Sequence, residues 1–554
     1  MRDAQRLPTT FALCAAILAL SLLGVPTPAR ASTGQQAILQ DDSALMRDPV
    51  QTLQRLRLLG VGTVRVALRW QSVAPATGSH QRPRGFRAAD AAAYPARNWA
   101  PYDEIVKDAR LDGITVLFDV VGGGPLWADA PGAPRDKRHP EWMPSAREFG
   151  SFVTAIGTRY SGRYTPAGSP SPLPRVHFWS IWNEPNFGQD LAPQAIKGST
   201  ISVAPGRYRD LVDAAWSAFH ATGHGGDQIL IGDLAPRGLT GRTSRHHPQG
   251  LPGNFGQTKP LQFIRTLYCV DSSYREYRGT DASARGCPTT LAGSRRFRGA
   301  HPGLFQARGF GIHPYPQDLP PTEERSHDPD FAAFPELPHL EAELDRLQRM
   351  YGSGTRFAIY NDEYGYLTNP PTRGRFVSPA TAAYYLNWAE YLSWRSPRIA
   401  STMQYLLYDP LHGDYASGLL FRNGREKPAY SAYRLPLYLP VTSTGRGHGL
   451  EVWGAVRPAR FASTGPGGGP QGVQIQFQSA SGRAFRTLRT VPITDPHGYF
   501  DVRMTFPSSG TVRLAWIYPV GPTHAMSPTR PVGDPLPPPP GSTAYSRDVR
   551  ITMR

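Results

Sequence analysis

The feature that most restricts the fold is a repeated alternation of short apolar runs with longer amphipathic segments between residues 37 and 436. The runs have the length of strands, and the segments between them repeat their apolar residues at helical spacing. Strands that alternate with helices indicate a parallel sheet, because each helix returns the chain to the same edge. Eight strands predict an α/β fold, a (β/α)8 TIM barrel. We expect them at residues 37–40, 63–70, 115–121, 176–182, 228–234, 309–315, 357–366 and 402–408.

Two of these strands end on carboxylates. Residues 176–186, VHFWSIWNEPN, alternate between two faces until Glu184 leaves the sheet. In residues 357–366, FAIYNDEYGY, Asp362 and Glu363 point to opposite sides, so only one of them can face the site that Glu184 faces. Barrel enzymes keep their chemistry at the carboxyl ends of the strands. Two carboxylates that converge there suit cleavage of a glycosidic bond, in which one protonates the leaving oxygen and the other attacks the sugar or activates water.

At these two stretches the chain resembles the retaining glycoside hydrolases of clan A. The WNEPN form is most similar to glycoside hydrolase family 39, with family 5 as a near relative. The resemblance implies that Glu184 is the acid/base and that Glu363 is the nucleophile. It also implies that Asn183 binds the sugar 2-hydroxyl. The chain departs from the family pattern at Asp362, where many members have Thr or Ser.

Further residues at strand ends are candidates for substrate binding. Arg65 stands where clan members often have an Arg near the nucleophile, and His313 and Tyr315 resemble strand-six residues that touch it. A salt-bridged barrel arginine and a hydrogen-bonded core histidine are the alternative interpretations. Aromatic rings offer flat apolar surfaces to sugar C–H groups, and core packing explains such rings equally well. The other candidates are Trp70, Trp127, Trp182, Gln404 and Tyr405.

Neither a metal nor a cofactor is expected. No cluster of His, Cys, Asp or Glu has the spacing of metal ligands, and Gly122-Gly123-Gly124 lacks the lysine of a phosphate-binding loop. The formal net charge is +17, but the arginines are scattered and no nucleic-acid-binding motif is present. A solvated basic surface therefore explains the charge better than a nucleic-acid partner. We expect a carbohydrate substrate, no nucleic acid and a monomer.

The N-terminus predicts export. Residues 1–31 begin with Arg2 and Arg6, continue with an apolar run at 11–25 and end on Ala29-Arg30-Ala31, which is the pattern of a secretory signal peptide cut after Ala31. No stretch reaches the roughly 18 apolar residues of a membrane span. We therefore expect a secreted protein, extracellular or associated with the cell envelope. One of the three cysteines leaves with the leader, so Cys269 and Cys287 are the only pair that can form a disulfide.

Beyond residue 437 the pattern changes to short alternating segments separated by Gly, Pro, Ser and Asp. Such segments are typical of an all-β sandwich. We expect the catalytic barrel at residues 32–437, a linker at 438–449 and an accessory β-sandwich at 450–554. The last region has no paired carboxylates at strand ends, so its role is structural support, carbohydrate binding or partnership with the barrel, with the first favoured.

The sequence thus predicts a secreted retaining glycoside hydrolase that cleaves O-glycosidic bonds, β-linked ones, in an oligo- or polysaccharide. One alternative is a family-5-like endoglucanase, which a pair of histidines after the third strand would favour and residues 120–122 do not supply. The other is a catalytically silent glycan-binding or envelope protein on a barrel scaffold. The presence of both acids argues against that second alternative.

Overall fold

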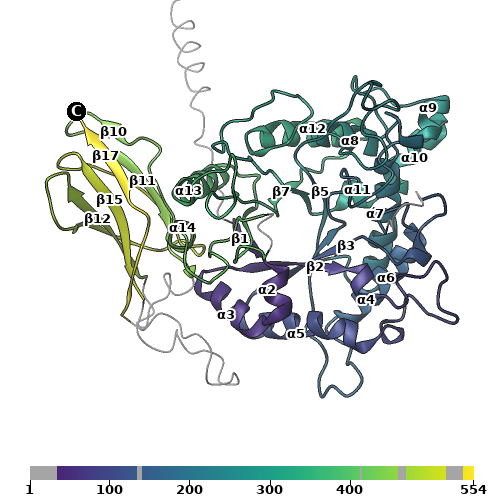
Figure 1. Ribbon diagram of the computed structural model, residues 1–554, viewed down its shortest axis with the longest axis horizontal. Helices are drawn as coiled ribbons and strands as arrows, with labels where there is room; N and C mark the ends of the chain where they lie inside the picture. The colour runs from purple at the N-terminus through teal and green to yellow at the C-terminus, as the bar shows by residue number, and fades with distance from the viewer. Residues whose placement is uncertain (1–33, 134–139, 412–414, 460–469, 519–540) are drawn as a thin grey trace, which may run out of the picture.

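The computed structural model describes residues 34–133, 140–411, 415–459, 470–518 and 541–554. Its barrel strands are β1 Gln36–Gln40, β2 Thr63–Arg69, β3 Thr115–Val121, β4 Phe178–Ile181, β5 Gln228–Leu234, β6 Gly309–Ile312, β7 Ala358–Asn361 and β8 Ser401–Tyr405. They form one parallel sheet in the order β7-β6-β5-β4-β3-β2-β1-β8. The sheet closes on itself because Ile359 of β7 bridges Ile399, just before β8. The predicted (β/α)8 barrel is confirmed (Figure 1).

Long helices connect these strands at the predicted places. They are α3 Pro49–Leu58, α5 Ala96–Asp112, α6 Ala146–Arg159, α7 Ala204–Ala221, α8 Pro260–Leu267, α12 Leu337–Met350 and α13 Pro379–Arg395. Their ends are set by local chemistry. Ser145 caps α6 by accepting the N–H of Glu148, and Gly113 ends α5 in the left-handed region, at φ 68°, which glycine adopts without strain.

The connection between α8 and β6 contains short helices of its own. Two of them, α9 Gly279–Ala284 and α10 Leu291–Ala300, lie within residues 271–301. Thr290 caps α10 by accepting the N–H of Gly293. Cys269 and Cys287 form the predicted disulfide at the base of this insertion. The crosslink and the cap stabilise helices that are too short to be stable alone.

The C-terminal region is all-β, as predicted. Its strands are β9 Leu437–Tyr438, β10 Ser443–Thr444, β11 Leu450–Ala455, β12 Gly472–Ser479, β13 Arg486–Pro492, β14 Tyr499–Met504, β15 Gly510–Ile517, β16 Thr543–Tyr545 and β17 Val549–Met553. One sheet has the order β10-β17-β15-β12-β13 with β16 on β15, and the other has the order β14-β11-β9. Apolar side chains of both sheets share one core. Because β9 and β10 pair in these sheets, part of the segment expected to be a linker belongs to the sandwich.

The sandwich packs against the barrel beside α13 and α14 Pro428–Arg434 (Figure 1). The contact is aromatic: Tyr391 of α13 packs against Tyr438 and Trp453, with ring centroids 5.0 and 5.5 Å apart. A buried ion pair joins Glu390 of α13 to Arg457, which follows β11. The two regions therefore share a desolvated interface with a charge pair inside it.

Breaking that ion pair is expected to destabilise the protein strongly. Glu390→Ala leaves Arg457 buried without its carboxylate. The Tyr499 hydroxyl loses its acceptor at 2.9 Å and keeps only Gln35 Oε1 at 3.1 Å. Loss of one partner of a buried pair costs about 3–5 kcal/mol. Urea denaturation followed by tryptophan fluorescence measures the change. The double variant Glu390→Leu/Arg457→Met, which removes both charges, should recover much of the loss. A loss below about 1 kcal/mol in Glu390→Ala would show that the pair contributes little.

The predicted signal peptide lies outside the described residues. Across the described ranges, no helix is both long enough and apolar enough to cross a membrane.

Candidate active site

The two predicted acids meet at the carboxyl end of the barrel. Glu184 lies three residues after β4, and Glu363 lies two residues after β7. His313, directly after β6, lies between them: its Nδ1 atom is 2.9 Å from Glu184 Oε1 and 3.8 Å from Glu363 Oε2. The two carboxylate oxygens can be no farther apart than the sum of these distances. Separations up to this limit include the about 5–5.5 Å between the carboxyl groups of retaining glycosidases. They include only the lowest part of the about 6.5–9.5 Å range of inverting ones.

Arg65 of β2 forms an ion pair with Glu363. Its side chain is 1% exposed, and its Nη1 atom donates to Glu363 Oε2 at 3.0 Å. Burial alone would lower the pKa of Arg65, but the charges of Asp119, Asp233 and Glu363 raise it well above its ordinary value. The guanidinium therefore stays charged and is ion-paired with the Glu363 carboxylate. Tyr315 donates its hydroxyl to the other oxygen, Glu363 Oε1, at 2.9 Å.

Glu184 lies in a different environment. Burial raises its pKa to about 7; the positive charge of Arg65 opposes this rise and the negative charge of Asp233 adds to it. Burial also lowers the pKa of His313 to about 4, so this imidazole is neutral at neutral pH. Because the Nε2 atom of His313 faces the Arg65 guanidinium, 3.5 Å away, Nδ1 is the nitrogen that carries the hydrogen and donates to Glu184. Glu363 is thus ion-paired with Arg65, whereas burial dominates the environment of Glu184.

Asn183 links Arg65 to a third carboxyl group, that of Asp190. Its side-chain oxygen accepts from Arg65 Nη2 at 3.0 Å, and its amide nitrogen donates to Asp190 Oδ1 at 3.3 Å. These two bonds fix the orientation of the amide and leave one N–H free to bind a ligand. Burial, and then the charge of Glu184, raise the pKa of Asp190 to about 8.

Backbone strain concentrates at this end of the barrel. Trp182 and Glu184 after β4, Asp233 within β5 and Leu406 after β8 have φ values of 71°, 38°, 46° and 73°. Non-glycine residues adopt the left-handed region at a cost of about 1–3 kcal/mol, and such residues cluster at functional sites. Glu184, three residues beyond the end of β4, is among these residues.

The aromatic candidates divide into two groups. Trp70 and Trp182 are fully buried: Trp70 stacks on Phe152 at 5.6 Å, and the indole N–H of Trp182 bonds the Asp190 carbonyl. Core packing is therefore their role. Trp127 is half-buried, donates its indole N–H to the Pro75 carbonyl and packs edge-on against Trp70.

Strand β8 contributes differently from expectation. Gln404 is buried and donates to the backbone carbonyls of Tyr405, Leu406 and Ser417, so it orients loops instead of meeting a ligand. Tyr405 is half-buried, with its ring 6.5 Å from that of Tyr315. Only the tyrosine of this pair lines the site.

A cavity of about 340 Å³ is lined by Tyr315, whose hydroxyl donates to Glu363, and by Tyr415, Leu367 and Phe376. Its position beside the tyrosine that touches Glu363 suits a sugar unit. Two other cavities, of about 520 and 660 Å³, lie at the opposite end of the barrel, where Thr115 begins β3. They are remote from the acids.

Neither a protein-family model nor a curated protein matches the sequence. Solved structures with similar architecture include a family 39 glycoside hydrolase from Bacteroides cellulosilyticus WH2, with 13% identity, 87% of this chain and 81% of that chain covered, and a TM-score of 0.44. A β-glucosidase from Thermotoga maritima has 13% identity, 73% and 97% coverage and a TM-score of 0.43. A mutant of Bacteroides uniformis β-glucuronidase 2 has 10% identity, 96% and 46% coverage and a TM-score of 0.37. Likenesses this distant assign no function to the chain.

The floor of the site contains charges that the sequence interpretation missed. Arg65 Nη2 contacts Asp119 at 2.8 Å and Asp233 at 3.2 Å, and all three residues are buried. Each aspartate stands inside an otherwise apolar strand, TVLFDVV or QILIGDL. A charged residue in the middle of an otherwise apolar strand is the sequence feature that could have predicted these buried charges.

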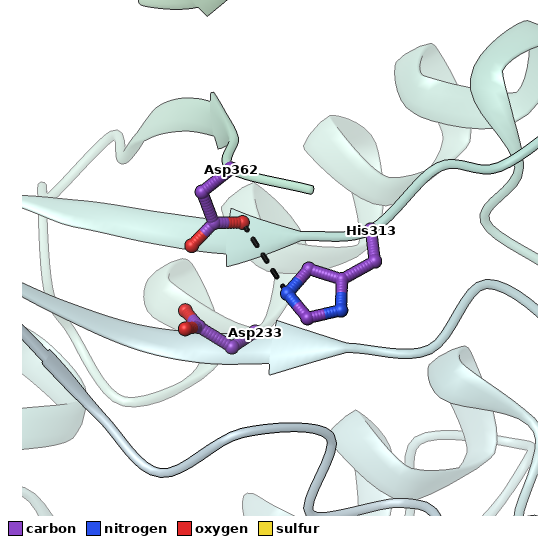
Figure 2. Close-up of side chains that lie close together, drawn as sticks. All are labelled: Asp233, His313 and Asp362. Atoms are coloured by element: carbon purple, nitrogen blue, oxygen red, sulfur yellow. Dashed lines mark ion pairs between the residues drawn. The ribbon is translucent and has the colours of Figure 1, made fainter. Parts of the chain in front are cut away.

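Asp233, His313 and Asp362 bring atoms of metal-ligand type within 4.8 Å of one another (Figure 2). The Arg65 guanidinium lies 3.2 Å from Asp233 Oδ2 and 3.5 Å from His313 Nε2. A positive charge already in contact with two of the three groups disfavours a divalent cation there. The arrangement suits a hydrogen-bonded cluster better than a metal site.

Proposed function

We propose that this protein is a retaining glycoside hydrolase that cleaves O-glycosidic bonds of a carbohydrate through a glycosyl-enzyme intermediate. The observation that carries the proposal is the unequal environment of two converging carboxyl groups. Glu363 is ion-paired with Arg65, whereas burial raises the pKa of Glu184 to about 7. A carboxylate ion-paired with an arginine is suited to the nucleophile role, and a carboxyl group whose pKa is raised is suited to the acid role.

In the proposed reaction, Glu363 attacks the anomeric carbon as the glycosidic C–O bond breaks. Glu184 gives its proton to the leaving oxygen in the same step. The hydroxyl of Tyr315 and the Arg65 guanidinium hold the attacking carboxylate in place through both of its oxygens. Glu184, now ionised, then takes a proton from water, which attacks the glycosyl ester and releases the sugar with its original anomeric configuration.

His313 supports the second role of Glu184. Its N–H bonds the Glu184 carboxyl group in both protonation states, and its neutrality avoids a positive charge that would hold Glu184 ionised. Asn183 offers the amide N–H that is not bonded to Asp190 to a sugar hydroxyl, and the rings of Trp127 and Tyr405 are proposed to pack against sugar C–H groups.

Export, followed by action on an oligo- or polysaccharide outside the cell, is part of the proposal. The N-terminal pattern of residues 1–31 and the Cys269–Cys287 disulfide support it, because disulfides persist in oxidising compartments. The sandwich, joined to the barrel by a buried aromatic contact, is proposed as structural support.

The test is turnover of a panel of aryl β-glycosides and polymeric glycans by the purified protein, with the anomer of the first product read by NMR. Hydrolysis with retained configuration supports the proposal. Inverted configuration contradicts the mechanism, and binding of a glycan without hydrolysis favours the silent glycan-binding alternative.

The pH dependence of kcat/KM gives a further prediction. Glu184 must be protonated when the substrate arrives, so activity should fall as pH rises through about 7, where this carboxyl group loses its proton. Initial rates on an aryl glycoside between pH 5 and pH 9 measure this alkaline limb, the fall in kcat/KM as pH rises. Asp190→Asn is the matched variant, because burial raises the pKa of Asp190 to about 8 in the same site. The limb should stay near pH 7 in Asp190→Asn; its disappearance would assign it to Asp190.

A further inference from the structure

Three buried carboxyl groups lie beneath the two acids, and among the described residues Arg65 is the only arginine or lysine that forms ion pairs with any of them. Asp119, Asp233 and Asp362 are each 0% exposed, and Arg65 is the guanidinium among them. Arg65 contacts Asp119 and Asp233, while Asp362 lies beyond its ion pairs. An ionised carboxylate without a partner is very costly to bury, so a group in this position takes up a proton instead.

Asp233 and Asp362 are complementary in their hydrogen bonds. Asp362 Oδ1 accepts the backbone N–H of Ile312 at 3.0 Å, and Asp233 Oδ2 accepts from Arg65 at 3.2 Å. The remaining oxygens, Asp233 Oδ1 and Asp362 Oδ2, are buried without a donor. Figure 2 shows the carboxyl groups of Asp233 and Asp362 facing one another.

Gly311 of β6 makes room for this approach. A Cβ atom on Gly311 would lie 1.9 Å from Asp233 Oδ1 and 2.7 Å from Asp362 Oδ2. Both unpartnered oxygens therefore converge on the space that the missing side chain leaves free. Two bare carboxylate oxygens in a dry site repel each other, whereas one proton between them provides each with a partner.

We propose that Asp233 and Asp362 share one proton, with the Asp362 carboxylic acid donating to Asp233, and that Asp362 is thereby a neutral positioning residue for the site above it. The bond fixes Asp233, which holds Arg65, which in turn holds Glu363. Because Asp362 is neutral, His313, 3.8 Å away, does not face a second negative charge. Burial raises the pKa of Asp362 well above its ordinary value, and the charge of Asp233 raises it further.

This inference rests on the proposed function only for its kinetic consequence, so the first measurement does not use activity. Infrared difference spectra of wild type and Asp362→Asn at pH 8 should show loss of the C=O stretch of a protonated carboxylic acid. Asp345→Asn, which changes an ion-paired carboxylate on α12, is the control and should show loss of carboxylate bands instead. Carboxylate loss in Asp362→Asn would overturn the proposal. Metal analysis of the wild-type protein should find no stoichiometric ion, and a stoichiometric ion lost in Asp362→Asn would equally overturn it.

The second measurement separates positioning from simple packing. Asp362→Asn keeps an acceptor for Ile312 and an N–H donor for Asp233, so kcat should fall less than about tenfold. Asp362→Leu is similar in size but leaves Asp233 Oδ1 without a donor, and kcat should fall about a hundredfold or more with a smaller change in KM. Equal losses in the two variants would refute the shared proton. If the wild-type protein hydrolyses no glycoside, the infrared result still decides the proton while the proposed function fails.

Discussion

Glu363→Gln is expected to lower kcat by at least about four orders of magnitude on every glycoside that the protein hydrolyses, because it removes the group that attacks the sugar. Glutamine keeps the size of the side chain and an oxygen for the Tyr315 hydroxyl, 2.9 Å away. It loses the negative charge that Arg65 binds and the lone pair that forms the ester. The defect should therefore lie in chemistry, with KM changed much less than kcat.

The control for this variant is the same substitution far from the site. Glu341→Gln on α12 removes a half-buried carboxylate that lies 4.0 Å from Arg398, and it should leave kcat unchanged. Circular dichroism of both variants should match that of the wild-type protein. A Glu363→Gln protein that folds and keeps more than about a hundredth of the wild-type kcat would remove Glu363 from the nucleophile role.

The identity of the nucleophile also has a direct chemical readout. A slow substrate that accumulates the intermediate should leave one glycosyl group on the peptide that contains Glu363, detectable by mass spectrometry after rapid acid quench. The adjacent Asp362 is the competing carboxyl group. A glycosyl group on Asp362 would reverse the assignment, although its complete burial beneath Arg65 argues that a sugar cannot reach it.

Strand positions were predictable where burial on both faces makes a continuous apolar run. The runs at 115–121 and 228–234 match β3 and β5 residue for residue. The ends of two strands that lead into the site were less well predicted: β6 and β7 stop at Ile312 and Asn361, before the residues that turn into the site. Side-chain alternation continues past the last ladder hydrogen bond there, so the sequence pattern overstates strand length.

The two acids were predictable because a carboxylate after an apolar strand has few structural uses. Their environments were not, because they depend on contacts distant in sequence. The Arg65 guanidinium forms ion pairs with Asp119, Asp233 and Glu363, which lie on or shortly after three other strands. No local sequence pattern predicts these contacts. Burial of aromatic rings was equally undetermined: Trp182 follows an alternating strand toward the site, but its positive φ turns the ring into the core.

Glu184→Ala should show a defect that depends on the leaving group. Loss of a general acid costs about 10²- to 10⁴-fold in kcat when the leaving oxygen needs a proton. Aryl glycosides with acidic phenols leave without one, so formation of the glycosyl-enzyme should be nearly unaffected, and turnover should be limited by the unassisted attack of water. Glu341→Ala on α12 is the control and should leave both substrate classes unchanged.

Azide then tests the second role of the same residue. Removal of Glu184 opens space beside the anomeric carbon and removes the negative charge that repels anions, so azide should attack the intermediate without base assistance. A β-linked substrate should give the β-glycosyl azide, because two displacements restore the original configuration. Azide rescue in Glu363→Ala should give the opposite anomer, since only one displacement occurs. If Glu184→Ala gave the inverted azide, the roles of the two acids would be exchanged.

The pH profile of Glu184→Ala completes this test, because it asks whether one group accounts for both the chemistry and the titration. Burial raises the pKa of Glu184 to about 7, so its removal should abolish the alkaline limb for activated aryl glycosides. Burial also raises the pKa of Asp190, to about 8, and this carboxyl group remains in the variant. A limb that persists near pH 8 in Glu184→Ala would belong to Asp190, through its hydrogen bond to Asn183. Only a flat alkaline profile together with azide rescue assigns the acid/base role to Glu184.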